Sequence, residues 1–288
     1  MLSNVEVLSR DRGIILALAS GCGADKLRRG SCDLSQFTDN KAIYHQDIGQ
    51  QTVVGRFAFL CWILALFIAL GIAPPVGLAE DQEREGGQVL PPGARPHGYS
   101  LEDMARLLAP FTTSGNDLKH YPNTPFQILY TISGGPPAMS ISCQNGGTGV
   151  LDSGCNAFKV NAGMEFFVPL LGVDDSPPVL GTFPTDEEGA IPYFFGSKNY
   201  GGREFVITVD CRSTRIGPGF LAGPVQTPPL LDGGGTHFIQ LGAFLEPLSL
   251  GLHVITVQGE IAGAGVLPTY GISCLKEIFS YFVEVVPY

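Results

Sequence analysis

Short apolar runs separated by glycine and proline make up most of the chain after residue 125. In 205–210 and 279–285 apolar and polar residues alternate with a period of two, which is typical of strands with one face toward solvent. The pattern predicts strands at residues 126–132, 139–143, 157–160, 165–171, 204–211, 237–244, 252–259 and 279–286. Strands at this spacing predict an all-β fold, an antiparallel β-sandwich of the jelly-roll or immunoglobulin-like kind.

One short amphipathic helix is predicted before the strands. Ser100 and Asp103 are spaced as in a capping box, and Pro110 is expected to end the helix. Its apolar stripe comprises Leu101, Met104, Leu107 and Leu108. A stripe at this spacing predicts a helix that packs on the sheet. The segments 173–192 and 216–235 are expected to be long loops, because they are rich in glycine and proline and lack a period.

An uncharged apolar segment, residues 57–73, precedes this domain. It is followed by the small residues Gly77 and Ala79 and by the charged run 80–85, which predicts a signal peptide at 56–79 that is cleaved after Ala79. The alternative is a retained anchor, in which case 57–73 would be the chain's one contact with a membrane. Seventeen residues span about 25 Å as a helix, slightly less than a bilayer core.

Residues 1–55 have a mixed composition and are expected to be an N-terminal extension of doubtful status. Translation from Val53 or Val54 would remove them, whereas Cys22 after a short apolar run resembles a lipoprotein cleavage site. Residues 80–98 are charged and then rich in glycine and proline, which predicts a flexible linker. The β-domain is therefore expected to span residues 99–288.

The charge of the chain is concentrated after Ala79. Those 209 residues carry 21 acidic and ten basic side chains, a net charge of −11, within a total of −10. Such a surface repels phosphate backbones, so nucleic acid is excluded as an expected partner. The pattern leaves a cell-envelope component or a glycan as candidate partners, and the specific partner is unknown.

Four of the seven cysteines follow Ala79: Cys143, Cys155, Cys211 and Cys274. An even number in an exported domain predicts disulfides, and the preferred pairing is Cys143 with Cys155 and Cys211 with Cys274. None of the four belongs to a C-x-x-C pair, which argues against a zinc or redox centre.

Three stretches together resemble a known family: 160–171 (VNAGMEFFVPLL), 245–257 (LEPLSLGLHVITV) and 282–287 (FVEVVP). They are similar to the patterns P-x-G-x-x-x-F-x-P-[IL]-[LI] and x-P-L-x-P-G-x-H-x-[IV]-x-[FV]-x-G, followed by a closing strand, in an uncharacterised family of exported bacterial and archaeal proteins. Here Asn161 and Leu250 replace two of the prolines, and the first helix lacks the family's tryptophans. The resemblance spans about residues 99–287 and implies export and a β-fold, but no activity.

No catalytic or cofactor motif is present in the sequence. There is no G-x-S-x-G, H-E-x-x-H, Walker or Rossmann pattern, and the glycines of 145–149 do not precede a phosphate-binding helix. The segment 145–154 is instead expected to be a turn bounded by a disulfide. Ser153 follows Asp152, but no histidine is tied to it by spacing. The sequence therefore predicts that the protein is not an enzyme and has no cofactor, with calcium as the one alternative.

Acidic residues in the loop 173–192 suggest that alternative. Asp174, Asp175, Asp186 and Glu187 offer the oxygen ligands that Ca²⁺ prefers. The competing interpretation, a solvated acidic loop, is favoured because the spacing is not that of an EF-hand.

Aromatic residues near glycines suggest a glycan platform. Tyr193 and Tyr200 would carry it, although aromatics in such a context are more often core residues. His253 is expected to be a satisfied core or cross-strand histidine rather than a ligand. Gly251, in the turn before it, is expected to take a positive φ.

Taken together, these patterns predict an extracytoplasmic protein that is secreted, periplasmic or at the cell surface. The expected function is a non-enzymatic surface or interaction domain. A carbohydrate-binding module is the alternative, and a secreted hydrolase is the third candidate.

Overall fold

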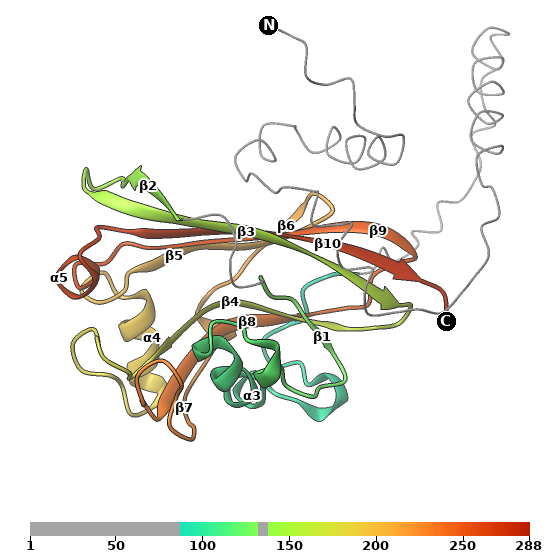
Figure 1. Ribbon diagram of the computed structural model, residues 1–288, viewed down its shortest axis with the longest axis horizontal. Helices are drawn as coiled ribbons and strands as arrows, with labels where there is room; N and C mark the ends of the chain where they lie inside the picture. The colour runs from blue at the N-terminus through green and yellow to red at the C-terminus, as the bar shows by residue number, and fades with distance from the viewer. Residues whose placement is uncertain (1–86, 132–137) are drawn as a thin grey trace, which may run out of the picture. The chain divides into compact units, whose positions relative to one another are not determined.

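The computed structural model describes residues 87–131 and 138–288 (Figure 1). The predicted N-terminal extension, signal peptide or anchor, and the first part of the linker lie outside these residues. The described strands form two sheets. The four-stranded sheet has the order β1 (Gln127–Ile128), β4 (Phe166–Asp174), β8 (His237–Leu245), β7 (Leu221–Gln226). The six-stranded sheet has the order β2 (Met139–Ser142), β3 (Thr148–Asn161), β10 (Leu275–Val286), β9 (Gly251–Ile261), β5 (Gly202–Val209), β6 (Arg212–Arg215).

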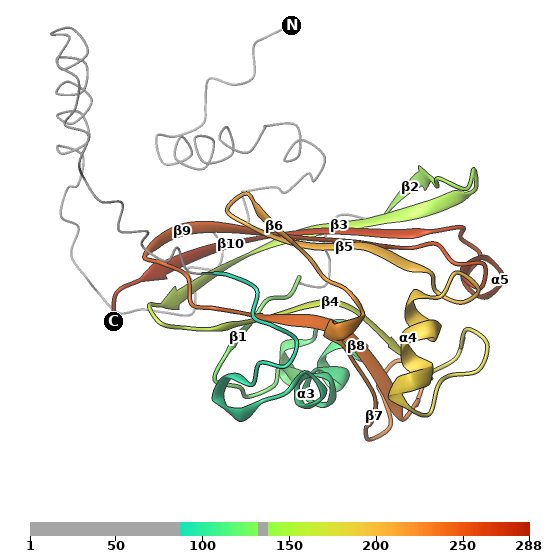
Figure 2. The same ribbon diagram turned by 180° about the vertical axis from the view of Figure 1, so that it is seen from behind.

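The main hydrophobic core contains buried side chains from both sheets. It includes Val168 of β4, Leu241 of β8, Val257 of β9 and Val283 of β10. On the edge-on views of Figures 1 and 2 the two sheets form two layers. The chain is thus mostly β with two mixed sheets, as the predicted all-β class requires in its broad form.

The four-stranded sheet is apolar on its second face as well. Phe167, Phe238 and Phe244 point away from the first core and join a second cluster with helix α3 (Leu101–Thr113). Alternate residues of β4 and β8 therefore enter different cores, which explains why these strands have apolar runs without a clear period. The helix was predicted, and its capping box between Ser100 and Asp103 is confirmed. It continues three residues past Pro110, where Ser114 donates its N–H to the Pro110 carbonyl.

Strand pairing is not purely antiparallel, because β1 runs parallel to β4 and β3 runs parallel to β10. The β3–β10 register runs from Leu275 opposite Val150 to Val286 opposite Asn161. This pairing places the start of β10 beside the start of β3, where the β2–β3 hairpin also returns.

The disulfide follows from that arrangement. Cys143 is bonded to Cys274, so the preferred pairings of Cys143 with Cys155 and of Cys211 with Cys274 were wrong. Proximity in sequence suggested the first of them, whereas parallel pairing joins segments 131 residues apart. Both sulfurs lie against Gly149, where a Cβ would collide with them. Cys155 and Cys211 are also disulfide-bonded, and neither is bonded to Cys143 or Cys274.

Several segments differ from their predicted structure. Helices α4 (Glu187–Phe195) and α5 (Val266–Tyr270) were not predicted, because α4 contains Gly189 and Pro192 and α5 is a single short turn. Strand β6 lies where no element was predicted, because it is polar throughout. Strand β7 lies within the expected loop 216–235, because it contains Gly223 and Pro224. The glycine-rich segment 145–154 is strand β3 from Thr148 onward.

The described end of the predicted linker, residues 87–98, is attached to the domain. Val89 bridges to Leu245 of β8, and Leu90 donates its N–H to the Phe244 carbonyl at 2.9 Å. The side chain of Val89 also packs on the main core. These contacts hold residues 87–90 beside β8.

We predict that Gly251→Val lowers the melting temperature by several degrees. Gly251 has a φ of +128° at the start of β9, as expected from the sequence, and a β-branched residue is strained there by about 1–3 kcal/mol. Gly217 has a φ of −113° and open space where a Cβ would lie. Calorimetry of Gly251→Val and of the control Gly217→Val should therefore show a loss only in the first, and equal melting temperatures would show that the conformation of Gly251 is not required.

Candidate functional site

A shallow groove of about 390 Å³ lies at the first turns of α3. It is lined by His97, Gly98, Tyr99, Asp103, Arg106 and Leu107. Tyr99 and Leu107 supply half-buried apolar surface, whereas Arg106 is exposed. An aromatic ring beside a few polar groups is a combination that small-ligand sites use.

Asp103 makes several polar contacts in the groove, whereas Arg106 makes one with a described residue. Asp103 Oδ2 accepts hydrogen bonds from the Ser100 N–H at 3.0 Å and from the Ser100 hydroxyl at 2.9 Å. These bonds lower the pKa of Asp103 below its usual value, and Arg106 and Arg95 lower it further. Arg106 has one described partner, Asp103 Oδ1 at 3.5 Å, and the ion pair is half exposed. Its remaining N–H groups face no described acceptor.

Buried neighbours fix the aromatic side of the groove. The ring of Tyr99 lies 5.4 Å from that of Phe126 at 85°, and Phe126 is buried. His97 also contacts Phe126 edge-on, and its Nε2 lies 3.0 Å from Glu165 Oε2. The orientation of Tyr99 is therefore set before any ligand arrives, which reduces the entropy cost of binding.

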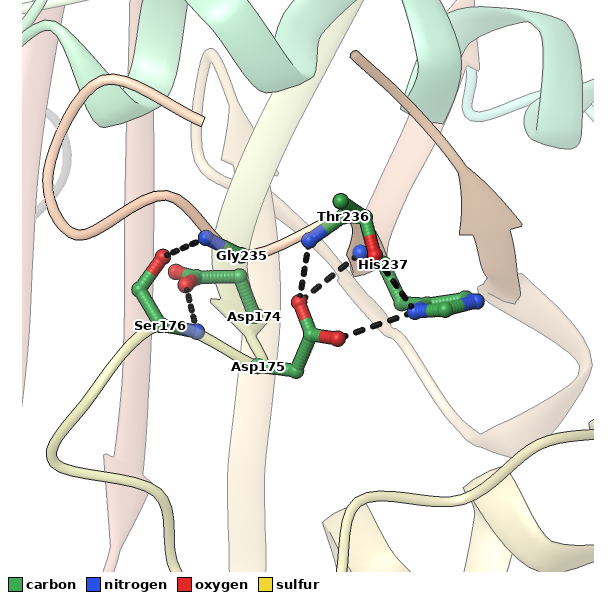
Figure 3. A network of polar contacts seen from close by, with 6 residues as sticks. All are labelled: Asp174, Asp175, Ser176, Gly235, Thr236 and His237. Carbon is green, nitrogen blue, oxygen red and sulfur yellow. Dashed lines mark hydrogen bonds and ion pairs between the residues drawn. The ribbon is translucent and has the colours of Figure 1, made fainter. Parts of the chain in front are cut away.

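Two of the residues suggested as calcium ligands, Asp174 and Asp175, accept hydrogen bonds from backbone N–H groups (Figure 3). Asp175 Oδ1 accepts bonds from the N–H groups of Thr236 at 2.6 Å and His237 at 2.8 Å. Asp174 Oδ1 accepts the Ser176 N–H at 2.7 Å. The Ser176 hydroxyl donates to Asp232 and accepts the Gly235 N–H. This network ties the end of β4 to the start of β8.

Asp186 and Glu187 lie at the start of α4, where Asp186 Oδ1 accepts the Gly189 N–H at 2.8 Å. Within residues 87–131 and 138–288, no three acidic, histidine or cysteine side chains come together as metal ligands. The four residues of the suggested calcium site are thus not gathered into one cluster.

Asp175 and His237 form a dyad that sequence reasoning did not identify. His237 Nδ1 lies 2.9 Å from Asp175 Oδ2, and the side chain of His237 is 40% exposed. Bonding at Nδ1 directs Nε2 outward, as in a catalytic base. Neither nearby hydroxyl is placed at Nε2, however. Thr236 Oγ1 lies 3.2 Å from Nδ1, and the Ser176 hydroxyl is bonded to Asp232.

Tyr193 and Tyr200 do not form an exposed platform. Their side chains are 4% and 3% exposed, and their rings pack against each other in the main core. The Tyr200 hydroxyl lies 2.6 Å from that of Tyr270. Burial raises the pKa of Tyr193 to about 12. The structure thus gives these residues the packing role that was the competing interpretation.

His253 is buried and satisfied, as the sequence predicted. Its Nδ1 faces the Asp210 carboxylate, and its Nε2 donates to the Ser249 carbonyl at 2.9 Å. The Ser249 hydroxyl is also 3.4 Å from Nε2, which resembles a hydrolase triad. Because Nε2 is occupied by the carbonyl, this histidine joins the β5–β6 turn to the β8–β9 turn rather than acting as a base.

Asp152 and Glu277 face each other across the β3–β10 pair. Both lie on the inner side of the six-stranded sheet, which Phe158 of β3 and Tyr281 of β10 share. No described residue donates a hydrogen bond to Glu277. Burial, with the charge of Asp152, raises the pKa of Glu277 to about 8. Ser153, beside Asp152, points to the opposite face and is buried, so it is not an exposed nucleophile.

Sequence reasoning missed the groove because its residues were divided between a predicted linker and a predicted helix. The available signal was composition. Arg95 and Arg106 balance Glu102 and Asp103 within 12 residues, whereas the described residues together carry nine lysines and arginines against 17 acidic side chains.

We predict that Glu277→Gln raises the melting temperature at pH 9 and leaves it nearly unchanged at pH 4.5. The folded-state pKa is raised, so the neutral carboxyl stabilises the fold at low pH and this stability is lost as the pH rises toward and past 8. Glu284→Gln on the outer face of β10, where Glu284 pairs with Lys159, is the control. Equal effects of Glu277→Gln at both pH values would contradict the prediction.

We also predict that Asp210→Asn destabilises the protein more at pH 5.5 than at pH 9. The hydrogen bond to Asp210 raises the pKa of His253, so its stabilisation is complete below about 6.5 and is lost as the pH rises through the folded-state value. Asparagine retains the acceptor for the Val254 N–H and tolerates the φ of +44°. Thermal melts that show the same loss at both pH values would refute this role.

Comparison with known proteins does not assign the chain to a family. No family model matches it, and no curated protein matches it. A solved structure of PbICP-C in complex with falcipain-2 aligns at 11% identity over 56% of this chain and 100% of that chain. The TM-score of 0.17 is too low to carry an argument about fold or function. In the described part of the chain, no helix is long and apolar enough to cross a membrane.

Proposed function

We propose that the chain is an exported, non-enzymatic domain that binds its partner outside the cytoplasm through the α3 groove. The main support is the groove itself, where a fixed aromatic ring lies beside an exposed guanidinium that has spare donors. Both are features of recognition sites and need no catalytic group.

The disulfide between Cys143 and Cys274 supports the location, because such bonds persist in oxidising compartments outside the cytoplasm. The resemblance to exported proteins in three sequence stretches supports it as well. Cleavage of the signal peptide, as opposed to a retained anchor, is part of the proposal and leaves the domain free in the extracytoplasmic space.

We further propose that the two sheets form a β-sandwich, because a single cluster of side chains contacts both of them. The parallel pairs β1–β4 and β3–β10 favour a variant of the jelly-roll or immunoglobulin-like plan over a purely antiparallel one. This architecture leaves the outer surface of α3 available to a partner.

A carbohydrate-binding module is the second candidate, and the neighbourhood of Tyr99 favours it. An aromatic ring that carries a sugar face, with Asp103 and Arg106 beside it for hydroxyl groups, is a common way to hold a saccharide. A secreted hydrolase is less well supported. Nε2 of His253 is used by the Ser249 carbonyl, and the hydroxyl beside His237 lies at Nδ1 rather than at Nε2.

Co-sedimentation with isolated bacterial cell envelopes tests the proposal. We expect the protein to sediment with envelopes and a Tyr99→Ala/Arg106→Ala double variant to remain in the supernatant. Exposed residues of the opposite sheet provide the matched control, Arg212→Ala/Arg215→Ala, which should sediment like the unmodified chain. Protease treatment of the envelopes beforehand separates a glycan from a protein partner, because only glycan binding survives it.

The proposal fails if the groove variant sediments as well as the unmodified protein. It also fails if the protein hydrolyses ester or glycoside substrates, because the domain would then be an enzyme.

A further inference from the structure

The α3 groove contains cations in a domain that is acidic overall. The described residues carry 17 acidic and nine basic side chains, and at this place Arg95 and Arg106 lie near Asp103, with Glu102 in the same helical turn and Glu165 beside His97. Electrostatic interactions between exposed charges decay over about 8–10 Å at physiological salt. The more distant carboxylates of the domain are therefore screened at the groove, and the exposed guanidinium of Arg106 can attract an anion there.

Arg106 is the group best placed to receive a ligand anion. Its side chain is 53% exposed, and its ion pair with Asp103 is an exposed pair of residues three apart. Pairs of this kind contribute about 0–1 kcal/mol, so a ligand carboxylate can replace Asp103 at little cost. A guanidinium also matches a carboxylate in a two-point contact, which a lysine cannot do.

The Asp103 carboxylate stays ionised without its contact to Arg106, because the hydrogen bonds from Ser100 lower its pKa. Its Oδ2 holds the two bonds from Ser100 that cap α3. Its Oδ1, which now faces Arg106, becomes an acceptor for a ligand hydroxyl once the guanidinium turns to a carboxylate. The groove thus offers a donor fork and a hydroxyl acceptor side by side.

Tyr99 supplies the third element of recognition. Its ring is held at 85° to Phe126, and its hydroxyl makes no hydrogen bond to a described residue. An apolar ring face suits the C–H face of a pyranose, and Leu107 extends the same surface. A peptide that adds a strand would need a free strand edge, and the groove is lined by loop and helix residues.

We propose that the α3 groove binds a uronic acid residue of an acidic glycan, with its carboxylate on Arg106, a ring hydroxyl on Asp103 and its pyranose ring on Tyr99. This inference rests on the proposed binding function and adds the chemical class of the ligand. A uronic acid satisfies all three groups at once, whereas a neutral sugar leaves Arg106 with only its exposed pair to Asp103.

Calorimetric titration with trimers of galacturonic and glucuronic acid tests the inference, and their methyl esters serve as matched uncharged probes. We expect at least one acid trimer to bind and its ester to bind at least tenfold more weakly. Arg106→Gln should weaken binding of the acid at least tenfold and leave the ester unaffected. The affinity of Arg106→Lys for the acid should lie between those of the unmodified chain and of Arg106→Gln, because lysine keeps the charge and loses the two-point contact.

Two further variants separate local from general effects. Tyr99→Leu should weaken the acid and the ester alike, with the melting temperature measured to confirm that the contact with Phe126 is not required for folding. Arg215→Gln on β6 should change nothing, and an equal loss there would show that the attraction is nonspecific and overturn the assignment.

Failure of the inference and failure of the proposed function have different signatures. Equal affinity for acid and ester, or an undiminished Arg106→Gln, overturns the uronic acid assignment while envelope binding through the groove stands. Absence of binding to both acid trimers also overturns it. If the groove double variant still sediments with envelopes, both the uronic acid assignment and the proposed function are overturned.

Discussion

The whole arrangement depends on burial of both faces of the four-stranded sheet. Strands β4 and β8 have large apolar side chains on each side, so one face needs the six-stranded sheet and the other needs α3. Phe111 of that helix and the rings beneath it, Phe167, Phe238 and Phe244, are almost completely buried. At about 1.5–3 kcal/mol for each ring, their burial is comparable to the net stability of a typical domain. Detachment of α3 would therefore unfold the protein.

This constraint also explains where the groove lies. The core under α3 fixes the helix axis, the capping box fixes its first turn, and Phe126 fixes Tyr99 above it. Glu165, just before β4, contacts His97, which also lines the groove. A ligand site made of side chains from a short loop and an exposed helical turn is thereby held on a rigid support, as precise recognition requires.

The sequence predicted those elements whose local signals agree with their environment. Helix α3 has a capping box and a single apolar stripe, and β5, β8, β9 and β10 have strong strand patterns, so all five were found within a few residues. The polar edge strand β6 and the proline-containing β7 lack such signals because sheet pairing, not propensity, holds them in place. The Cys143–Cys274 bond depends on parallel pairing of β3 with β10, a long-range feature that spacing does not encode. The groove was missed for a similar reason: residues 95–107 contain no ligand-binding motif, and only the fold brings Phe126 and Glu165 against that segment.

Binding of an acidic saccharide at the α3 groove can be located directly on the molecule. An NMR titration of the isotope-labelled protein with a uronic acid trimer locates binding without any substitution. We expect backbone amide shifts to change first and most strongly in residues 95–107 and at Glu165, and to saturate together. Changes centred on His237 or on β6, or no changes at millimolar ligand, would refute binding at this groove.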